Sequence, residues 1–276
     1  MTAVVCQVCG RSDTQTFTRR GHAITSCRQC DHVWATPPAA GVDYAKLYGA
    51  NYYGAGEHTA ETISRYNLRN IEPTKRAQAQ WSLRRIARHK PAGRLLDVGC
   101  SAGVFAASAR EAGYAVTAFD VSAVAVQFAR EHFGLDAQVT ALETANFPAE
   151  AFDVITLWDV IEHTEDPWQA LRKVTGWLAP GGIIAVRTPN TRCLRVRLCG
   201  LTNWDMVSPP EHWQLFSRRS LRLFLSQNGF RVLELQTVHS DRIFYRQTPR
   251  WRQAPFWISA ACGWGGDLVA IATRQP

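Results

Sequence analysis

The 276-residue chain lacks any apolar run of the ~18 to 20 residues that a membrane-spanning helix needs. Its most apolar stretch, residues 256–272, is interrupted by glycines and by Asp267. The first residues have neither a basic leader nor a long apolar segment. Internal repeats and low-complexity segments are also absent, and 46% of the residues are hydrophobic. The composition therefore excludes a mainly disordered chain and favours a folded, cytoplasmic protein without a transmembrane segment.

Lysine is scarce, with only four residues, and arginine supplies the rest of the 31 basic side chains. Against 23 acidic residues, this leaves a formal net charge of +8. Such an excess suits an acidic partner such as a nucleotide, RNA or an anionic lipid surface. It is equally compatible with a solvated surface that binds nothing, so charge alone does not choose a partner.

Cysteine, in contrast, is present eight times, and four of the cysteines form two pairs with the spacing CxxC. Cys6 and Cys9 form the first pair, and Cys27 and Cys30 follow after 17 intervening residues. Each pair can place two thiolates on one side of a tight turn, and two facing turns complete a tetrahedron around zinc. His22 and His32 lie nearby as alternative ligands. Because four cysteines leave no open position for water or substrate, we expect a structural Zn²⁺ site.

Composition shifts along the chain predict three parts. Residues 1–40 form the zinc ribbon, and residues 41–90 form a tyrosine-rich lid followed by a helical linker. We expect this linker to be helical over Ala60–His89 and divided at Pro73. Residues 91–276 form the main domain, with an insert at 188–216.

In the main domain, short apolar strands alternate with amphipathic helices, which is typical of a parallel sheet with helices on both faces. The expected strands are Leu95–Val98, Ala115–Phe119, Ala137–Leu142, Val154–Trp158, Ile183–Arg187, Val232–Val238 and Leu268–Thr273. The expected helices are Val104–Ala112, Ala123–Phe133, Pro167–Leu178 and Arg219–Asn228, the last of which should end at Gly229.

The loop after the first of these strands has the features of a nucleotide-binding turn. Asp97 precedes Gly99, and Gly103 opens the next helix, but the GxGxxG pattern of pyrophosphate binders is absent. A carboxylate at this point would repel a phosphate and attract a cationic amino-acid group. Asp120 ends the next strand, where a carboxylate can accept hydrogen bonds from both hydroxyls of a ribose.

Taken together, four motifs in order resemble the class I S-adenosylmethionine-dependent methyltransferases. They are LLDVGCSAG at 95–103, FD at 119–120, FDVITLWDVIEHTEDP at 152–167 and LAPGG at 178–182. The resemblance covers residues 91–276 and is greatest to the small-molecule, deoxysugar and ubiquinone-type enzymes. It implies an α/β, Rossmann-like sheet, mostly parallel with an antiparallel last strand, and S-adenosylmethionine as cofactor.

The resemblance also assigns roles to single residues. Asp97, Gly99, Cys100 and Gly103 would hold the methionyl end of the cofactor or let the backbone approach it, and Asp120 would bind the ribose. Leu142 and Glu143 would flank the adenine, although Ala141 replaces the acidic residue often found there. Trp158 and Asp159 should face the methyl-transfer centre, or Trp158 only packs in the core.

An acceptor that loses a proton requires a base, and the best candidates are His212, Glu211 and His163. In the enzymes that methylate deoxysugars, a similar Glu-His element lies over the acceptor. The alternatives are that His212 caps the helix that begins near Ser217, and that Glu162-His163 only orders its loop. The tyrosines from Tyr44 to Tyr53 would close over the sulfonium or pack the ribbon on the core.

The expected partner is a small-molecule acceptor. Arginines of the insert and of the segment 242–252 would suit an anionic acceptor such as a nucleotide sugar, or would give peripheral contact with a lipid surface through Trp251, Phe256 and Trp257. Two other functions remain open, methylation of ribosomal RNA guided by the ribbon and a non-catalytic, zinc-bearing interaction module. The oligomeric state is not predicted.

Overall fold

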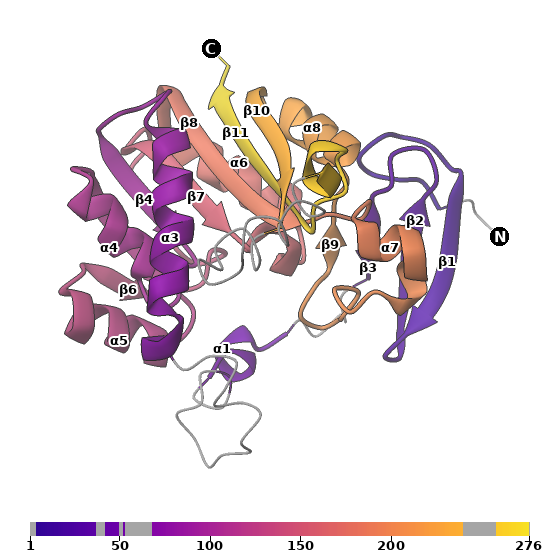
Figure 1. Ribbon diagram of the computed structural model, residues 1–276, viewed down its shortest axis with the longest axis horizontal. Helices are drawn as coiled ribbons and strands as arrows, with labels where there is room; N and C mark the ends of the chain where they lie inside the picture. Colours follow the sequence, from indigo (N-terminus) through magenta and orange to yellow (C-terminus); the bar gives the residue numbers. More distant parts are fainter. Residues whose placement is uncertain (1–3, 37–41, 50–51, 53–67, 240–257, 276) are drawn as a thin grey trace. The chain divides into compact units, whose positions relative to one another are not determined.

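The computed structural model describes residues 4–36, 42–49, 52, 68–239 and 258–275, with backbone alone for residues 68–71 (Figure 1). The chain divides into two compact units. Unit 1 consists of residues 1–42, 159–175 and 184–276, and unit 2 of residues 43–158 and 176–183. Each unit therefore contains segments that are far apart in the sequence. Among the described residues, no helix is long and apolar enough to cross a membrane.

Unit 2 is built around parallel strands. The strands are β4 (Arg94–Val98), β5 (Ala115–Asp120), β6 (Ala137–Val139) and β7 (Phe152–Trp158). Strand β4 pairs in parallel with β5 on one side and with β7 on the other, and β5 pairs in parallel with β6. The chain thus leaves β4 in one direction and returns to its other side, which makes the carboxyl end of β4 a topological switch point. In sheets of this kind, ligands bind at such a point.

The residues of β4 and β7 explain why these strands are central. Leu95, Leu96, Val154 and Ile155 are completely buried, without the alternation of a strand that has one wet face. A continuous apolar run of this length is what a parallel strand covered on both faces requires.

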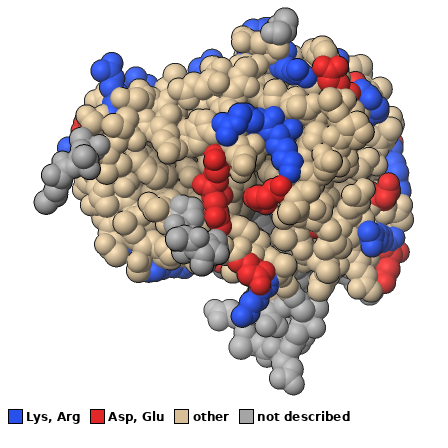
Figure 2. Space-filling model, turned by 180° about the vertical axis from the view of Figure 1, so that it is seen from behind, with Lys and Arg blue, Asp and Glu red and all other residues tan. Residues whose placement is uncertain are grey.

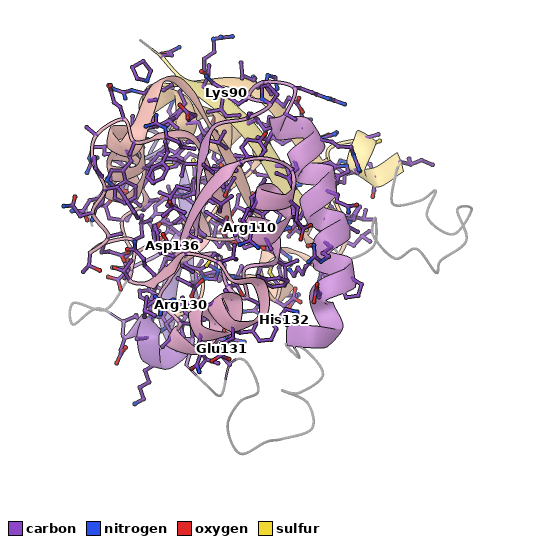
Figure 3. The ribbon with its side chains drawn as sticks, turned by 90° about the vertical axis from the view of Figure 1, so that its left-hand side faces the viewer. Lys90, Arg110, Arg130, Glu131, His132 and Asp136 are labelled. Atoms are coloured by element: carbon purple, nitrogen blue, oxygen red, sulfur yellow. The ribbon has the colours of Figure 1, made fainter. Side chains whose placement is uncertain are left out.

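The helices of unit 2 precede or connect these strands. They are α1 (Tyr44–Leu47), α3 (Leu68–Ile86), α4 (Val104–Glu111) and α5 (Ala123–Phe133), and α3 packs against α4. Figure 3 labels Arg110 on α4 and Arg130, Glu131 and His132 on α5. The guanidinium of Arg110 donates to the carbonyls of Phe133 and Gly134, at 2.7 and 2.8 Å. A cation at this position satisfies the last carbonyls of α5 and complements the helix dipole.

Unit 1 contains a second, antiparallel sheet, of the order β1-β2-β3-β9. Strands β1 (Thr14–Arg19), β2 (His22–Cys27) and β3 (Val33–Ala35) come from the cysteine-bearing segment, here called the ribbon (residues 4–36). The fourth strand, β9 (Gln214–Leu215), comes from the end of the predicted insert and pairs with β3. No pattern in the sequence predicts this pairing.

The rest of unit 1 includes the carboxyl-terminal strands β10 (Phe230–Val238) and β11 (Asp267–Arg274), which pair antiparallel, as expected of the last strand. Its helices are η1 (Ile161–His163), α6 (Pro167–Trp177), α7 (Leu194–Cys199), η2 (Leu201–Asn203) and α8 (Arg218–Gln227). Strand β8 (Leu178–Pro189) contributes residues to both units, as does α6, and the seven-stranded sheet has the order β10-β11-β8-β7-β4-β5-β6. This mostly parallel sheet confirms the predicted α/β, Rossmann-like class.

Most predicted elements agree with the structure to within a few residues, but one expectation was wrong. The helix α3 continues through Pro73 instead of being divided there. A proline removes one hydrogen bond from a helix, and in this helix the buried side chains of Ala79, Leu83 and Ile86 outweigh that loss. Tyr53, residues 60–67 of the predicted linker helix, and the arginines and aromatic residues of 242–257 lie outside the described residues.

Candidate functional site

The loop after β4 turns sharply before α4 begins. Gly99, Ser101 and Gly103 all have positive φ angles, of 67°, 49° and 78°. The backbone N–H of Cys100 donates to the carbonyl of Phe119 at 2.9 Å, which fixes the loop to β5. A residue other than glycine in the left-handed region carries backbone strain, so Ser101 indicates a loop held in shape by its surroundings.

Asp97 is the last polar residue of β4, and its side chain is only 1% exposed. Its Oδ1 accepts a hydrogen bond of 2.7 Å from the hydroxyl of Thr156 on β7. Its Oδ2 is buried and has no hydrogen-bond partner among the described residues. Burial raises the pKa of Asp97 to about 7, helped by the charge of Asp120 and opposed by the Thr156 hydrogen bond. A cationic ligand group at Oδ2 would satisfy this oxygen and favour its charged form.

Asp120 ends β5 and is held by backbone amides of two loops. Its Oδ2 accepts from the N–H of Ser101, and its Oδ1 from the N–H of Ser122, both at 2.8 Å. Burial raises the pKa of this carboxyl group, and the amide hydrogen bonds oppose the rise. Each oxygen retains accepting capacity after one hydrogen bond, so the carboxylate is oriented and can still accept from two hydroxyls.

The other predicted cofactor residues of unit 2 have different surroundings. The side chain of Cys100 lies in a hydrophobic cluster with alanines of α4 and α5, so only its backbone is suited to a ligand. A Cβ on Gly103 would lie 2.7 Å from Leu135 Cδ1 and 2.8 Å from Ala129 Cβ. This glycine is therefore required for the packing of α4 on α5.

Leu142, Glu143 and Trp158 complete the predicted set. Leu142 is 7% exposed and Glu143 is exposed, in the turn that follows β6. The indole of Trp158, at the end of β7, meets the ring of Phe105 edge-on at 5.1 Å. Its Nε1 is buried without a hydrogen-bond partner among the described residues. Trp158 therefore both packs and keeps an unused donor.

These groups fit S-adenosylmethionine better than a phosphorylated cofactor. Asp97 Oδ2 and Trp158 Nε1 are buried and find no partner among the described residues, and Asp120 offers two oriented acceptors. Cationic and hydroxyl groups satisfy the carboxylates, whereas a pyrophosphate would meet two negative charges. The donor set thus matches an ammonium or sulfonium group and a ribose.

Unit 1 brings the predicted acid–base residues together in what we call the histidine cluster, Glu162, His163 and His212. One ligand atom from each of the three lies within 4.8 Å of the others, so the cluster could hold a proton or a metal ion. The two imidazole rings are 4.8 Å apart between centroids. Glu211 contributes its backbone carbonyl, which is hydrogen bonded to His163 at 2.6 Å.

Backbone carbonyls select the form of both imidazoles. His212 Nδ1 lies 2.7 Å from the carbonyl of Met206, and His163 Nδ1 is bound to that of Glu211. Because a carbonyl only accepts, each Nδ1 carries the hydrogen, and each neutral ring has its lone pair on Nε2. Burial lowers the pKa of His163 to about 4, with His212 as a further cause, and burial also lowers the pKa of His212. Both rings are therefore neutral at neutral pH, with the lone pair on Nε2, and the low pKa makes His163 a weak base.

A partly exposed ion pair, Arg187–Asp159, adjoins the cluster. The guanidinium of Arg187 donates from Nε to Asp159 Oδ1 at 2.7 Å and also binds Oδ2. Burial opposes the charge of Arg187, but the Asp159 carboxylate outweighs it and raises its pKa. Burial raises the pKa of Glu162 well above its ordinary value, and the charge of Asp159 adds to this effect. The position of Arg187 beside the insert suggests a partner in an anionic acceptor, whereas the structure gives it an internal partner.

The neighbouring arginines of the insert also have partners. Arg192 lies 3.5 Å from Asp31, Arg195 lies 3.4 Å from Asp205, and Arg197 stacks over the ring of Trp264. On the face shown in Figure 2, basic and acidic side chains are interspersed among other residues and do not form a continuous basic surface.

The four paired cysteines of the ribbon form a compact cluster. Their sulfur atoms all lie within 4.8 Å of one another, with 3.6 Å between Cys6 and Cys30 and 3.4 Å between Cys9 and Cys27. Two thiolates on a tetrahedral zinc with bonds of about 2.3 Å are about 3.8 Å apart. The donor set and its spacing therefore fit Zn²⁺. His32 Nδ1 lies 3.9 Å from Cys6 Sγ, and the ring of His22 meets Trp213 instead.

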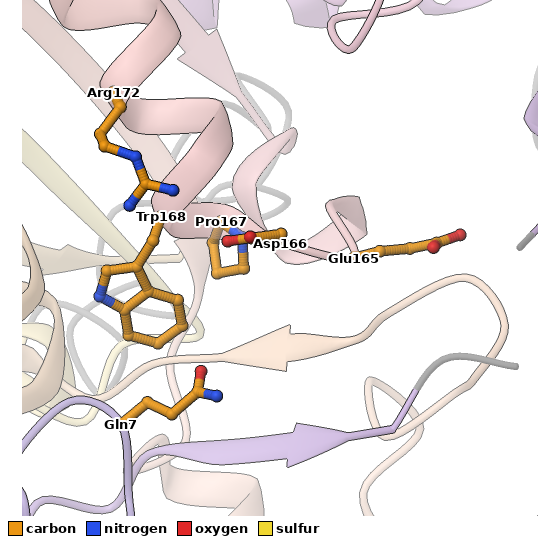
Figure 4. Close-up of a pocket in the computed structure, with 6 residues that line it drawn as sticks. All are labelled: Gln7, Glu165, Asp166, Pro167, Trp168 and Arg172. Carbon is orange, nitrogen blue, oxygen red and sulfur yellow. The ribbon is translucent and has the colours of Figure 1, made fainter. Parts of the chain in front are cut away.

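A shallow hollow of about 490 Å³ lies beside the first cysteine pair (Figure 4). In the close-up, the indole of Trp168 and the amide of Gln7 flank the hollow, and Glu165 points away from both. Arg172, Asp166 and Pro167 complete the lining. None of the predicted site residues belongs to it.

Comparison with known proteins identifies the family. Residues 68–235 match the family model described as a methyltransferase domain. The chain is 35% identical over 145 residues to the ubiquinone biosynthesis O-methyltransferase of Caulobacter vibrioides, an alignment that covers 48% of this chain and 57% of that protein. With that of Parvibaculum lavamentivorans it shares 33% identity over 169 residues, 57% of this chain and 65% of the other. The chain thus spans less than two thirds of the length of these relatives.

Solved structures agree on the fold. An S-adenosylmethionine-dependent methyltransferase from Mesorhizobium loti superposes with a TM-score of 0.55 at 20% identity, over 71% of this chain and 98% of that one. A methyltransferase of the same kind from Archaeoglobus fulgidus superposes with a TM-score of 0.54 at 19% identity, over 76% of this chain and 100% of that one. The family model matches more than half of the residues, and together with the parallel sheet and the loop between two carboxylates it shows that this chain belongs to the class I S-adenosylmethionine-dependent methyltransferases.

Proposed function

We propose that this protein transfers a methyl group from S-adenosylmethionine to a hydroxyl group of a small-molecule acceptor. The observation that carries the proposal is the pair of carboxylates on adjacent strands. Asp97 has an unsatisfied buried oxygen, and Asp120 is oriented by two amides at the switch point of the sheet. The similarity to O-methyltransferases supports oxygen as the accepting atom.

When bound, S-adenosylmethionine would supply an electrophilic methyl group on a sulfonium. Asp97 would hold its ammonium end, Asp120 would accept from the ribose hydroxyls, and Leu142 and Glu143 would flank the adenine. His212 would accept the acceptor's proton at Nε2, since its Nδ1–H is engaged by the Met206 carbonyl. His163, the second candidate, would remain neutral and support the ring of His212, 4.8 Å away between centroids, and the insert 188–216 would cover the acceptor and exclude water.

The ribbon would hold one structural Zn²⁺ through Cys6, Cys9, Cys27 and Cys30. A four-thiolate site is saturated, so the metal would stabilise the ribbon and would not bind substrate. Residues 41–90 would serve as the tyrosine-rich lid and linker, and Tyr48 and Tyr52 of this segment already contact each other edge-on at 4.9 Å.

Ribosomal RNA is the alternative acceptor, supported by the net charge of +8. The partners of Arg187, Arg192 and Arg195 weaken this alternative, because each of these cations faces a carboxylate. A polyanion groove would require exposed cations that are free to release counterions on binding.

The test is methyl transfer from labelled S-adenosylmethionine to a panel of catechols, hydroxylated sugars and bulk RNA. We expect turnover with a small hydroxylated molecule, and His212→Ala should lower it about 10²-fold or more while calorimetric affinity for the cofactor is unchanged. His132→Ala is the matched control, because His132 lies on the surface of α5 and binds Glu72. Transfer to RNA alone, with a steep salt dependence, would contradict the proposal, and wild-type turnover of His212→Ala would remove His212 as the base.

A further inference from the structure

The backbone of Trp213 connects the ribbon with the histidine cluster. Its N–H donates to the carbonyl of Glu162 at 2.8 Å, and its carbonyl accepts from the N–H of Ala35 at 2.9 Å. Ala35 is the last residue of β3, and Trp213 follows His212 directly. One buried residue therefore bonds to the ribbon on one side and to the cluster on the other.

The next residue, Gln214, extends this connection to the cysteines. Strand β9 pairs with β3 with Gln214 opposite Trp34, and His32 Nε2–H donates to Gln214 Oε1 at 3.1 Å. His32 and Gln214 are only 1% and 5% exposed. His32 Nδ1 also lies 3.9 Å from Cys6 Sγ. His32 therefore contacts both the cysteine cluster and Gln214 of β9.

Neither of these strands has a stable position of its own. Strand β9 has two residues and β3 has three, both below the usual strand length of ~5 to 6. A ribbon of this size also has too small a core to fold without its metal. Pairing with β3 therefore contributes to the position of β9, together with the bridge between Asn190 and Phe216 just after it, and the position of β3 depends on the cysteine cluster.

We propose that the zinc ribbon is the positioning element of the histidine cluster, and that Gln214 is the positioning residue that transmits its order to His212. The inference rests on the proposed function for the role of His212 in proton transfer. The ribbon would act on turnover through its pairing with β9, and the chain's affinity for S-adenosylmethionine, which depends on unit 2, would be independent of it.

The experiment compares two glutamines that both bind the ribbon. Gln214→Met removes the hydrogen bond to His32, and Gln227→Met removes the 2.9 Å bond from Gln227 Nε2 to the carbonyl of Val8, between the first two cysteines. Both variants replace a glutamine with methionine. Of the two glutamines, only Gln214 belongs to β9, which follows His212 in the chain. Long-range ¹H–¹⁵N spectra of histidine-labelled protein report the imidazole tautomer, and the spectrum of His212→Ala assigns the signal.

We expect His212 to be a single Nδ1–H tautomer in the wild type and in Gln227→Met, and a mixture in Gln214→Met. Turnover should fall about tenfold or more in Gln214→Met only, with cofactor affinity unchanged in both variants. An unaltered His212 signal in Gln214→Met, or equal losses in both variants, would overturn the proposal.

Metal removal from the wild type is the second measurement, for the case that Gln214→Met does not fold. A chelator should change the His212 signal in step with the loss of zinc, and a signal that persists in metal-free protein would overturn the proposal. The spectra test the positioning even if His212→Ala keeps its turnover, so failure of the proposed function and failure of this inference are distinguishable.

Discussion

At the scale of single residues, the chemistry depends on groups whose burial changes their charge. Asp97 is the main example, since one of its oxygens is bound by Thr156 and the other has no partner among the described residues. Its pKa of about 7 means that much of the carboxyl is protonated near neutral pH in the chain without a ligand. Binding a cation would therefore be linked to the release of a proton.

This burial predicts a pH dependence of stability. The folded-state pKa of Asp97 is raised from 3.8 to about 7, so the folded chain holds a proton that the unfolded chain has lost in this window. The contribution of Asp97 to the free energy of unfolding is complete below pH 3.8 and should decline by up to about 4 kcal/mol as the pH rises through 7. Urea unfolding at several pH values between 3.8 and 7 measures the free energy of unfolding of the wild type and of Asp97→Asn. A difference between the two proteins that does not change with pH would contradict this prediction.

The sequence identified Asp97 and Asp120 because an acidic residue at the end of an apolar strand is a visible pattern. It did not identify Thr156, Ser101 or Met206, which orient these carboxylates and His212. Their roles arise from contacts between residues distant in the sequence, such as Thr156 opposite Asp97 in the register of β4 and β7. A threonine within an apolar strand carries no signal of such a contact.

At the scale of elements, the strands and helices of the main domain were predictable because apolar periodicity and glycine or serine boundaries mark them. Ser217 caps α8 through a reciprocal pair of hydrogen bonds with Ser220. His212 is therefore not the cap of this helix. The two-residue strand β9 was not predictable, because only its partner in the ribbon makes it a strand. The continuity of α3 through Pro73 likewise depends on packing.

The junction of α4 and α5 allows backbone strain to be separated from overpacking. Gly103 and Gly134 both have positive φ, but only a Cβ at Gly103 would collide with Leu135 and Ala129. We expect Gly134→Ala to lower the free energy of unfolding by about 1 kcal/mol and Gly103→Ala by an additional 1 to 3 kcal/mol, roughly. Equal values in denaturant titrations would show that the collision is relieved by movement of α5.

At the scale of the whole molecule, the ribbon is a part of unit 1 and not an appended module. Ser217 Oγ donates to the carbonyl of Cys30 at 2.6 Å, and Thr191 Oγ1 donates to that of Asp31 at 2.7 Å. Loss of the metal should therefore destabilise more than the ribbon itself.

If the ribbon holds zinc as proposed, we expect Cys27→Ser to bind none and to lower the Tm of unit 1. Cys199→Ser is the control, because Cys199 is exposed and outside the cluster. Elemental analysis and calorimetric melting measure the two effects. One equivalent of zinc retained by Cys27→Ser would contradict the four-thiolate site.

The hydrogen bond between His32 and Gln214 joins residues 182 positions apart, which has a consequence for biosynthesis. During translation the amino-terminal strands leave the ribosome first, but their sheet lacks its fourth member until most of the polypeptide has been made. Contacts this distant also form slowly, because a large loop must close before they stabilise anything. The ribbon, which is synthesised well before β9, is therefore among the last parts to reach its native state, and its thiols depend on a reducing environment throughout that delay.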